Sequence, residues 1–165
     1  MHKLIILRGN SGSGKTTIAK KLQKKFGRNT MIISQDMIRR DIISVNDGEN
    51  TLALPLMEEL LIYGNKHCEI VILEGIMYAD WYAPLFELAI QLYDTRVYAY
   101  YFDLPFEETL KRHKTKPNCT DFGEEEMCHW WREKDYSNFL SEISITADKD
   151  EEQIVSEIYN CITNE

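Results

Sequence analysis

Short apolar runs and helical stripes alternate along almost the whole chain. Each apolar run is typical of a strand buried on both faces, because successive residues are apolar and not only every second one. In the helical stretches the apolar residues recur three and four positions apart, as Ile18, Ala19 and Leu22 do. The pattern predicts strands at 3–8, 30–34, 69–73, 96–102 and, more weakly, 142–146.

Helices are expected in the intervals between these strands. Gly27 and Gly64 are predicted to end two of them, because glycine is favoured just after a helix. Pro105 is predicted to open another, and acidic residues follow it where they suit the helix dipole. Asp148 or Asp150 can cap the last helix. The expected helices cover 15–26, 36–43, 54–63, 81–93, a stretch after residue 105 and a stretch near the C-terminus.

This alternation predicts the α/β fold class. Strands that are apolar throughout and separated by helices form a parallel sheet covered on both faces. Ligands of such sheets bind at the carboxyl ends of the strands. Candidate chemistry is therefore expected just after the first strand, at Gln35-Asp36, at Glu74-Gly75 and at Asp103, although a turn or cap role is favoured for Asp103.

A glycine-rich segment directly follows the first expected strand. It reads Gly9-Asn10-Ser11-Gly12-Ser13-Gly14-Lys15-Thr16-Thr17 and fits the phosphate-loop pattern G-x-x-x-x-G-K-[ST]. Glycines permit left-handed turns that point successive backbone N–H groups inward, where they cradle phosphate oxygens. Lys15 supplies charge for the β- and γ-phosphates, and Thr16 offers a hydroxyl to Mg²⁺. The helix that begins at Lys15 adds the positive end of its dipole, so a nucleoside triphosphate site is predicted.

Length and composition indicate one globular domain. With 165 residues, of which 44% are hydrophobic and 28% charged, a disordered chain or a coiled coil is excluded, and residues 1–165 are expected to form a single domain. No apolar run approaches the roughly 18 residues that span a bilayer, and the apolar stretch 4–7 is too short for a signal peptide. A cytoplasmic protein with four free cysteine thiols and no membrane partner is expected.

Charge and missing motifs narrow the class of nucleotide-binding protein. A guanine-specific switch would carry N-K-x-D, but the nearest string, Asn65-Lys66-His67-Cys68, lacks the aspartate. A motor ATPase needs extra segments for which 165 residues leave little room. The net charge of −8 weighs against broad binding of nucleic acid. A small kinase is favoured, which needs an acceptor-facing carboxylate, a metal-organising acid and mobile positive charge.

Two strand ends supply candidate acids. Asp36 and Arg39 lie three residues apart on one face of the helix expected after the second strand. Asp36 can accept the proton of the acceptor hydroxyl while Arg39 holds an anionic or polar part of the acceptor; alternatively, Asp36 caps the helix and pairs with Arg39 at the surface. Glu74 ends an apolar strand, where an acid is costly to bury unless it is paired. It can organise Mg²⁺ through water or bind acceptor hydroxyls.

The segment 112–132 interrupts the alternation of strands and helices. It contains Arg112, Lys114, Lys116 and Arg132, together with loop signals and the pair Trp130-Trp131. One interpretation is a lid that brings positive charge to the transferring phosphoryl group and excludes water. The other is a solvated helix with a charged face. Its place in the order of elements favours the lid.

These segments together resemble the small P-loop kinases of the zeta-toxin, polynucleotide-kinase and chloramphenicol-phosphotransferase group. The resemblance implies a P-loop three-layer sandwich with five parallel strands in the order 2-3-1-4-5 and a lid. It also implies that Asp36 is the catalytic base, that Arg39 is the arginine that follows it, and that Arg112 and Arg132 are lid arginines. Members phosphorylate nucleic-acid 5′ ends, sugar nucleotides and antibiotics, so the acceptor stays open. The segments that carry the resemblance are 9–17, 35–39, 73–75, 103–113 and 122–132.

The sequence thus predicts a kinase that transfers the γ-phosphoryl group of ATP, with Mg²⁺, to a hydroxyl of a small-molecule or nucleotide acceptor. The alternatives are a polynucleotide 5′-hydroxyl kinase and a regulatory module that binds or slowly hydrolyses ATP. The acidic balance weighs against a polynucleotide. The predicted site residues are Lys15, Asp36 and Arg132 for catalysis, 9–17 and Arg112 for the nucleotide, Arg39 and Glu74 for the acceptor, and Thr16 for Mg²⁺.

Overall fold

A five-stranded parallel sheet forms the centre of the molecule, in a computed structural model that describes residues 2–117 and 119–164. The strands follow the order β2-β3-β1-β4-β5 across the sheet. The predicted fold class and strand order are therefore confirmed. The strands are β1 (Lys3–Gly9), β2 (Thr30–Ser34), β3 (Ile70–Gly75), β4 (Val97–Phe102) and β5 (Glu142–Ile145).

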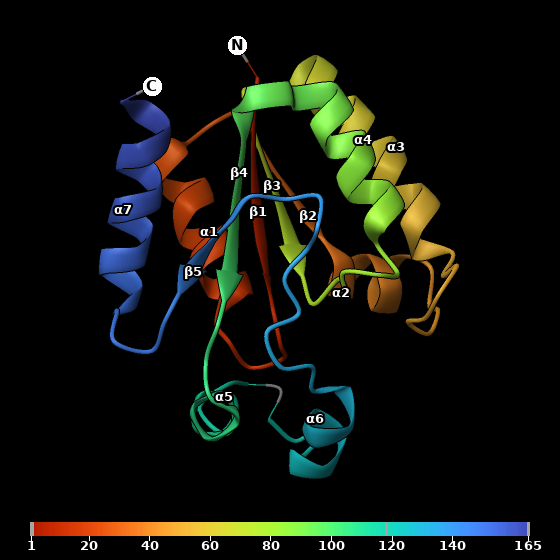
Figure 1. Ribbon diagram of the computed structural model, residues 1–165, viewed down its shortest axis with the longest axis vertical. Helices are drawn as coiled ribbons and strands as arrows, with labels where there is room; N and C mark the ends of the chain where they lie inside the picture. Colours follow the sequence, from red (N-terminus) through yellow and green to blue (C-terminus); the bar gives the residue numbers. More distant parts are fainter. Residues whose placement is uncertain (1, 118, 165) are drawn as a thin grey trace.

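Helices cover both faces of the sheet (Figure 1). One face carries α1 (Lys15–Phe26) and α7 (Glu151–Thr163), and the other carries α3 (Ala53–His67) and α4 (Ala83–Tyr93). Residues 4–7 of β1 alternate between the two resulting cores, which explains why all four of them are apolar. None of the helices in the described part of the chain has the length and apolarity needed to cross a membrane.

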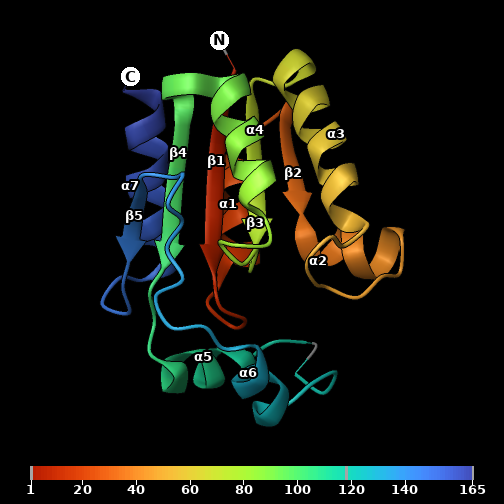
Figure 2. The same cartoon turned by 45° about the vertical axis from the view of Figure 1, so that its right-hand side comes forward.

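Two further helices lie apart from both layers, beyond the carboxyl ends of the strands. They are α5 (Phe106–His113) and α6 (Glu124–Trp130), and the two views agree on their position (Figures 1 and 2). Residues 131–141, which we call the return arm, lead from α6 back along the sheet to β5 (Figure 1). The predicted lid segment thus lies over the edge of the sheet where ligands of this fold class bind.

A fully buried arginine anchors the return arm. Arg8 in β1 pairs with Glu142 of β5 at 2.7 Å and with Asp135 of the return arm at 3.2 Å. Its guanidinium also donates to the carbonyl oxygen of Met77 at 2.9 and 3.0 Å. The buried charge of Arg8 is therefore paired and hydrogen-bonded, as a charge in a low-dielectric core requires. Arg8 joins the sheet, the loop after β3 and the return arm.

Several helix boundaries differ from the predicted ones. Gly64 does not end α3; a Cβ there would lie 2.6 Å from Cγ2 of Val71, so the glycine lets the helix approach β3 closely. The helix expected at 36–43 is a short α2 (Gln35–Met37) continued by a π-helix (Ile38–Ile42). Of the two predicted caps of α7, Asp150 is the one that accepts a hydrogen bond, from the backbone of Gln153 at 2.8 Å.

Candidate functional site

The phosphate loop connects β1 to α1 at the carboxyl edge of the sheet. Gly9, Gly12 and Gly14 all have positive φ, at 146°, 79° and 94°. A Cβ at Gly9 would lie 2.9 Å from Cβ of Phe102, and one at Gly12 would lie 2.6 Å from the carbonyl oxygen of Thr109. Glycine is therefore required both for the backbone conformation and for the packing of the loop against β4 and α5.

Lys15 is buried at the start of α1, with 7% of its surface exposed. Its ammonium donates to the carbonyl oxygen of Asn10 at 2.8 Å and to Oγ of Ser13 at 3.0 Å. Burial lowers the pKa of Lys15 to about 7; Lys116 lowers it further, and Glu74 opposes the shift. The charge is therefore held by neutral oxygens of its own loop, in the place where phosphate oxygens are expected.

Glu74 ends β3 and is 2% exposed. Both of its carboxylate oxygens accept a hydrogen bond from Oγ1 of Thr16 at 3.1 Å, and Oε1 also accepts one from Oγ of Ser34 at 2.5 Å. Carboxylate and hydroxyl oxygens are the ligands that a hard cation such as Mg²⁺ prefers. The residues fit a magnesium site in which Thr16 and Glu74 lie side by side.

Asp36 lies just after β2, the strand that neighbours β3 in the sheet. Its side chain is 59% exposed, and its Oδ1 accepts hydrogen bonds from Arg39 at 3.0 Å and from Arg40 at 2.7 Å. The helix cap is Ser34, whose Oγ accepts from the backbone N–H of Met37 at 3.5 Å. The alternative in which Asp36 is the cap is therefore wrong, whereas the surface pairing with Arg39 is present and includes a second arginine.

A buried glutamine holds this part of the site in place. Gln35 is 3% exposed, and its amide donates to Asp47 at 3.0 Å and to the hydroxyl of Tyr82 at 2.7 Å. Its Oε1 accepts from the backbone N–H of Met77 at 3.1 Å. These bonds join the start of α2 to the loop after β3 and to the loop before α3. Gln35 thus fixes the position of the neighbouring Asp36.

A cavity of about 620 Å³ opens between the π-helix and the lid. Arg39 and Arg40 line one side, and Phe122 and Trp130 line the other. The guanidinium of Arg40 lies 5.7 Å from the centre of the Phe122 ring, so the two sides touch across the cavity. Asp36 is not among the residues that line the cavity, but its carboxylate is paired with the two arginines that are.

Two lid cations accompany the phosphate loop. Arg112 donates to the carbonyl oxygen of Ser13 at 3.2 Å and pairs with Glu108 at 2.9 Å. Lys116 is partly buried, and this burial lowers its pKa, while the carboxylates of Glu74 and Asp36 oppose the shift. The charges of both candidate acids therefore act on Lys116, which the sequence identified only as one charge of the lid.

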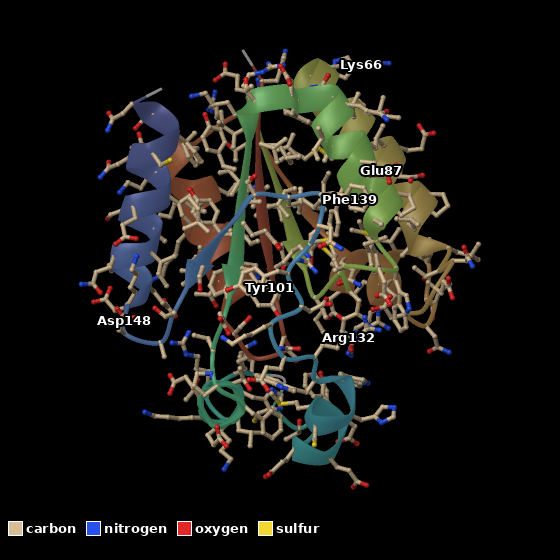
Figure 3. The ribbon with its side chains drawn as sticks, viewed as in Figure 1. Lys66, Glu87, Tyr101, Arg132, Phe139 and Asp148 are labelled. Atoms are coloured by element: carbon tan, nitrogen blue, oxygen red, sulfur yellow. The ribbon has the colours of Figure 1, made fainter. Side chains whose placement is uncertain are left out.

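The backbone of Arg132 contacts the phosphate loop, whereas its guanidinium is bound elsewhere. The guanidinium pairs with Asp80 at 2.6 Å and lies 3.8 Å from the ring centre of Tyr78 and 5.1 Å from that of Trp81. Its backbone N–H and C=O both bond to the side chain of Asn10. In Figure 3 Arg132 lies between the lid helices and the sheet.

The structure therefore brings most of the predicted site residues to one edge of the sheet. The guanidinium of Arg132 is the exception, because Asp80 holds it on the loop after β3. The sequence placed Gln35 in a candidate segment but gave it no role, and it did not single out Arg40. The sequence indicated these two residues only by position, since Gln35 directly precedes Asp36 and Arg40 directly follows Arg39.

Comparisons with known proteins agree with this architecture. A family model described as an AAA domain matches residues 4–129, more than half of the chain. A gluconokinase from Sinorhizobium meliloti 1021 has a similar structure, with a TM-score of 0.65 and 15% identity over 98% of this chain and 92% of that one. The APS kinase of Mycobacterium tuberculosis, in complex with AMPPNP and APS, gives 0.63 and 16% over 99% and 98%.

A shikimate kinase from Acinetobacter baumannii, in complex with shikimate, gives a TM-score of 0.62 and 16% identity over 99% of this chain and 94% of that one. No curated protein matches the sequence. At this level of identity the likeness shows the fold alone.

Proposed function

This chain belongs to the AAA domain family, and on that premise we propose that it is an ATP-dependent kinase whose acceptor is a hydroxyl of a small molecule or nucleotide. One observation carries the proposal. The phosphate loop, with Lys15 and the Thr16–Glu74 pair, lies at the same sheet edge as Asp36 and the cavity of about 620 Å³ beside it. A donor site and an acceptor site therefore meet under one lid, which phosphoryl transfer requires.

The donor side supplies positive charge in a buried setting. Lys15, Arg112 and Lys116 surround the loop, and charge that develops on a transferring phosphoryl group is stabilised most strongly where water is excluded. Thr16 and Glu74 would hold Mg²⁺, which when bound neutralises charge on the phosphate oxygens. Lys15 would exchange its bonds to Asn10 and Ser13 for bonds to phosphate.

The acceptor side supplies a base and anion-binding groups. The acceptor hydroxyl oxygen forms a bond to the γ-phosphorus as the bond to the β–γ bridging oxygen breaks, ADP departs, and the hydroxyl proton passes to Asp36. Arg39 and Arg40 now share that carboxylate, and an anionic or polar group of the acceptor would bind them from the cavity. The motifs shared with the zeta-toxin and polynucleotide-kinase group support the same role for Asp36.

Small acceptors are favoured over polynucleotides. The cavity beside Asp36 has the volume of a small-molecule site, and the net charge of −8 opposes a long polyanion. The gluconokinase, APS kinase and shikimate kinase that share the fold are named for small acceptors, which supports the same class here.

A labelling experiment tests the proposal. The protein is incubated with [γ-³²P]ATP, Mg²⁺ and a small-metabolite extract, and in parallel with a 5′-hydroxyl oligonucleotide, with Lys15→Ala as the control. A labelled small product that Lys15→Ala does not form supports the proposed kinase. Label on the oligonucleotide would replace it with a polynucleotide kinase. Free phosphate alone in every reaction would replace it with a regulatory ATP-hydrolysing module.

A further inference from the structure

One side chain of the phosphate loop holds the end of the lid. The amide of Asn10 donates to the carbonyl oxygen of Arg132 at 2.7 Å, and its Oδ1 accepts from the backbone N–H of Arg132 at 3.0 Å. Asn10 is 6% exposed, so these bonds are shielded from water. The contact joins residues 122 positions apart and involves no atom of the Arg132 side chain. A carboxamide carries a donor and an acceptor on separate atoms, so one side chain can pair with both the C=O and the N–H of one residue.

A second contact fixes the neighbouring backbone. The hydroxyl of Tyr78 donates to the carbonyl oxygen of Trp130 at 2.5 Å. Residues 130 and 132 are thus tied to the loop after β3 and to the phosphate loop, at the point where the return arm leaves α6. These contacts hold the backbone of Arg132 beside the phosphate loop.

The side chain of Arg132 is held much less firmly than its backbone. Its guanidinium pairs with Asp80, whose side chain is 64% exposed, and at the longer distance of 4.0 Å with Asp135, and it lies against the faces of Tyr78 and Trp81. An ion pair with an exposed partner contributes little to stability, so the guanidinium can readily exchange Asp80 for another anion. A triphosphate bound to the adjacent loop would offer that anion.

We infer that Asn10 is a positioning residue, which holds the backbone of Arg132 so that its guanidinium can leave Asp80 and reach the phosphates by side-chain rotation alone. This inference rests on the proposed function. The backbone carbonyl of Asn10 also accepts the hydrogen bond from Lys15, at 2.8 Å. Asn10 therefore contacts both Lys15 and Arg132. Before nucleotide binds, both cations are thus held near the place where the transferring phosphoryl group is expected.

A double-mutant cycle tests the inference through turnover. Arg132→Ala is expected to lower kcat by about 10²-fold, as for the loss of one charge-stabilising group. Asn10→Ala keeps the backbone amide of the loop and is expected to lower kcat by about tenfold through misplacement of Arg132. If Asn10 acts through Arg132, the double variant is no slower than Arg132→Ala. Additive losses, about 10³-fold in the double variant, would overturn the inference.

A matched control separates positioning from a loss of stability. Asn65 donates to the carbonyl oxygen of Leu92 at 3.0 Å, which is also a side-chain bond to a distant backbone, between α3 and the end of α4. Asn65→Ala is expected to lower Tm about as much as Asn10→Ala does, with kcat unchanged. An equal fall of kcat in both variants would mean that the contact of Asn10 is only structural.

Amide hydrogen exchange followed by NMR gives a readout that does not depend on activity. The amide of Arg132 is expected to be protected in the wild type and to exchange at least tenfold faster in Asn10→Ala, while amides of β1 keep their rates. Unchanged exchange at Arg132 would overturn the inference even if kcat fell. Absence of phosphoryl transfer by the wild type would remove the proposed function and this inference with it, whereas transfer with additive losses would remove only the inference.

Discussion

The two sides of the site are built in opposite ways. On the donor side Lys15 is 7% exposed and Glu74 is 2% exposed, and each is hydrogen-bonded by neighbours in the phosphate loop or at the strand ends. On the acceptor side the Asp36 side chain is 59% exposed and that of Arg40 is 38% exposed. Buried polar groups must be satisfied within the fold, because an unpaired one is costly. Exposed ion pairs contribute only about 0–1 kcal/mol and can be exchanged for a ligand.

In the proposed reaction this difference separates the constant substrate from the variable one. A triphosphate is the same in every kinase, so its site can be rigid and buried, with the phosphate loop at its centre. The acceptor differs from enzyme to enzyme, so its site can be more exposed and held by ion pairs that a ligand exchanges. Substitutions on the donor side are therefore expected to affect every step, and those on the acceptor side to affect transfer alone.

Loss of the loop cation is expected to have the largest effect. Lys15→Ala should lower turnover by about 10³-fold and also weaken nucleotide binding, because the variant loses the buried charge that faces the phosphates. Steady-state kinetics and calorimetry with the magnesium–nucleotide complex measure the two effects. Lys20→Ala removes an exposed lysine of the same helix and is the control. Nucleotide binding of wild-type strength in Lys15→Ala would contradict the rigid donor site.

Loss of the acceptor-side carboxylate is expected to split binding from transfer. Asp36→Asn should leave nucleotide affinity nearly intact while cutting transfer by about 10²-fold or more, because the amide cannot accept the hydroxyl proton. Asp41→Asn alters a carboxylate of the adjoining π-helix, which lines the cavity, and should change kcat less than about threefold. Equal transfer rates in Asp36→Asn and the wild type would remove Asp36 from the mechanism.

The contrast between the two sides also governs what the sequence could predict. The strands and the phosphate loop depend on local pattern, and Lys15 and Thr16 lie where the motif predicts. Gly64 was misread because its reason is Val71, a neighbour on another element that no local pattern reveals. A glycine inside a helix and a glycine that ends one look the same until the packing is known.

Residues of the lid show the same limit more strongly. Arg132 belongs to the predicted lid segment 112–132, and its guanidinium contacts Asp80, which lies 52 positions away in the sequence. Lys116 follows α5, and the charges of Glu74 and Asp36 act on it. Side-chain direction in such segments depends on tertiary contacts, so composition could not identify which of these cations lies near which acid.

A neutral replacement of the buried acid sharpens the comparison by separating two roles of Glu74. Glu74→Gln keeps an acceptor for Thr16 but removes the charge, so the Mg²⁺ concentration for half-maximal rate should rise about tenfold. Initial rates over a range of free Mg²⁺ measure this. Glu69→Gln, an exposed position just before β3, is the control. An unchanged Mg²⁺ requirement with a raised KM for the acceptor would instead assign Glu74 to the acceptor side.

The smallest expected effect is a pH dependence confined to the donor side. Burial lowers the pKa of Lys15 to about 7, whereas bound phosphates favour its charged form, so binding above pH 7 must take up a proton. Nucleotide affinity should therefore fall by about eightfold between pH 7.5 and 8.5, because the fraction of free protein with a charged Lys15 falls by that factor. The unfolded chain keeps that proton up to a pKa of 10.5, so the same burial makes the free protein more stable as pH rises above 7. Calorimetry in two buffers of different ionisation enthalpy should count nearly one proton taken up per nucleotide at pH 8.5, and none in Lys15→Ala. Equal proton uptake by the wild type and Lys15→Ala would mean that Lys15 is already charged in the free protein. Water would then solvate the donor side more than the burial of Lys15 implies.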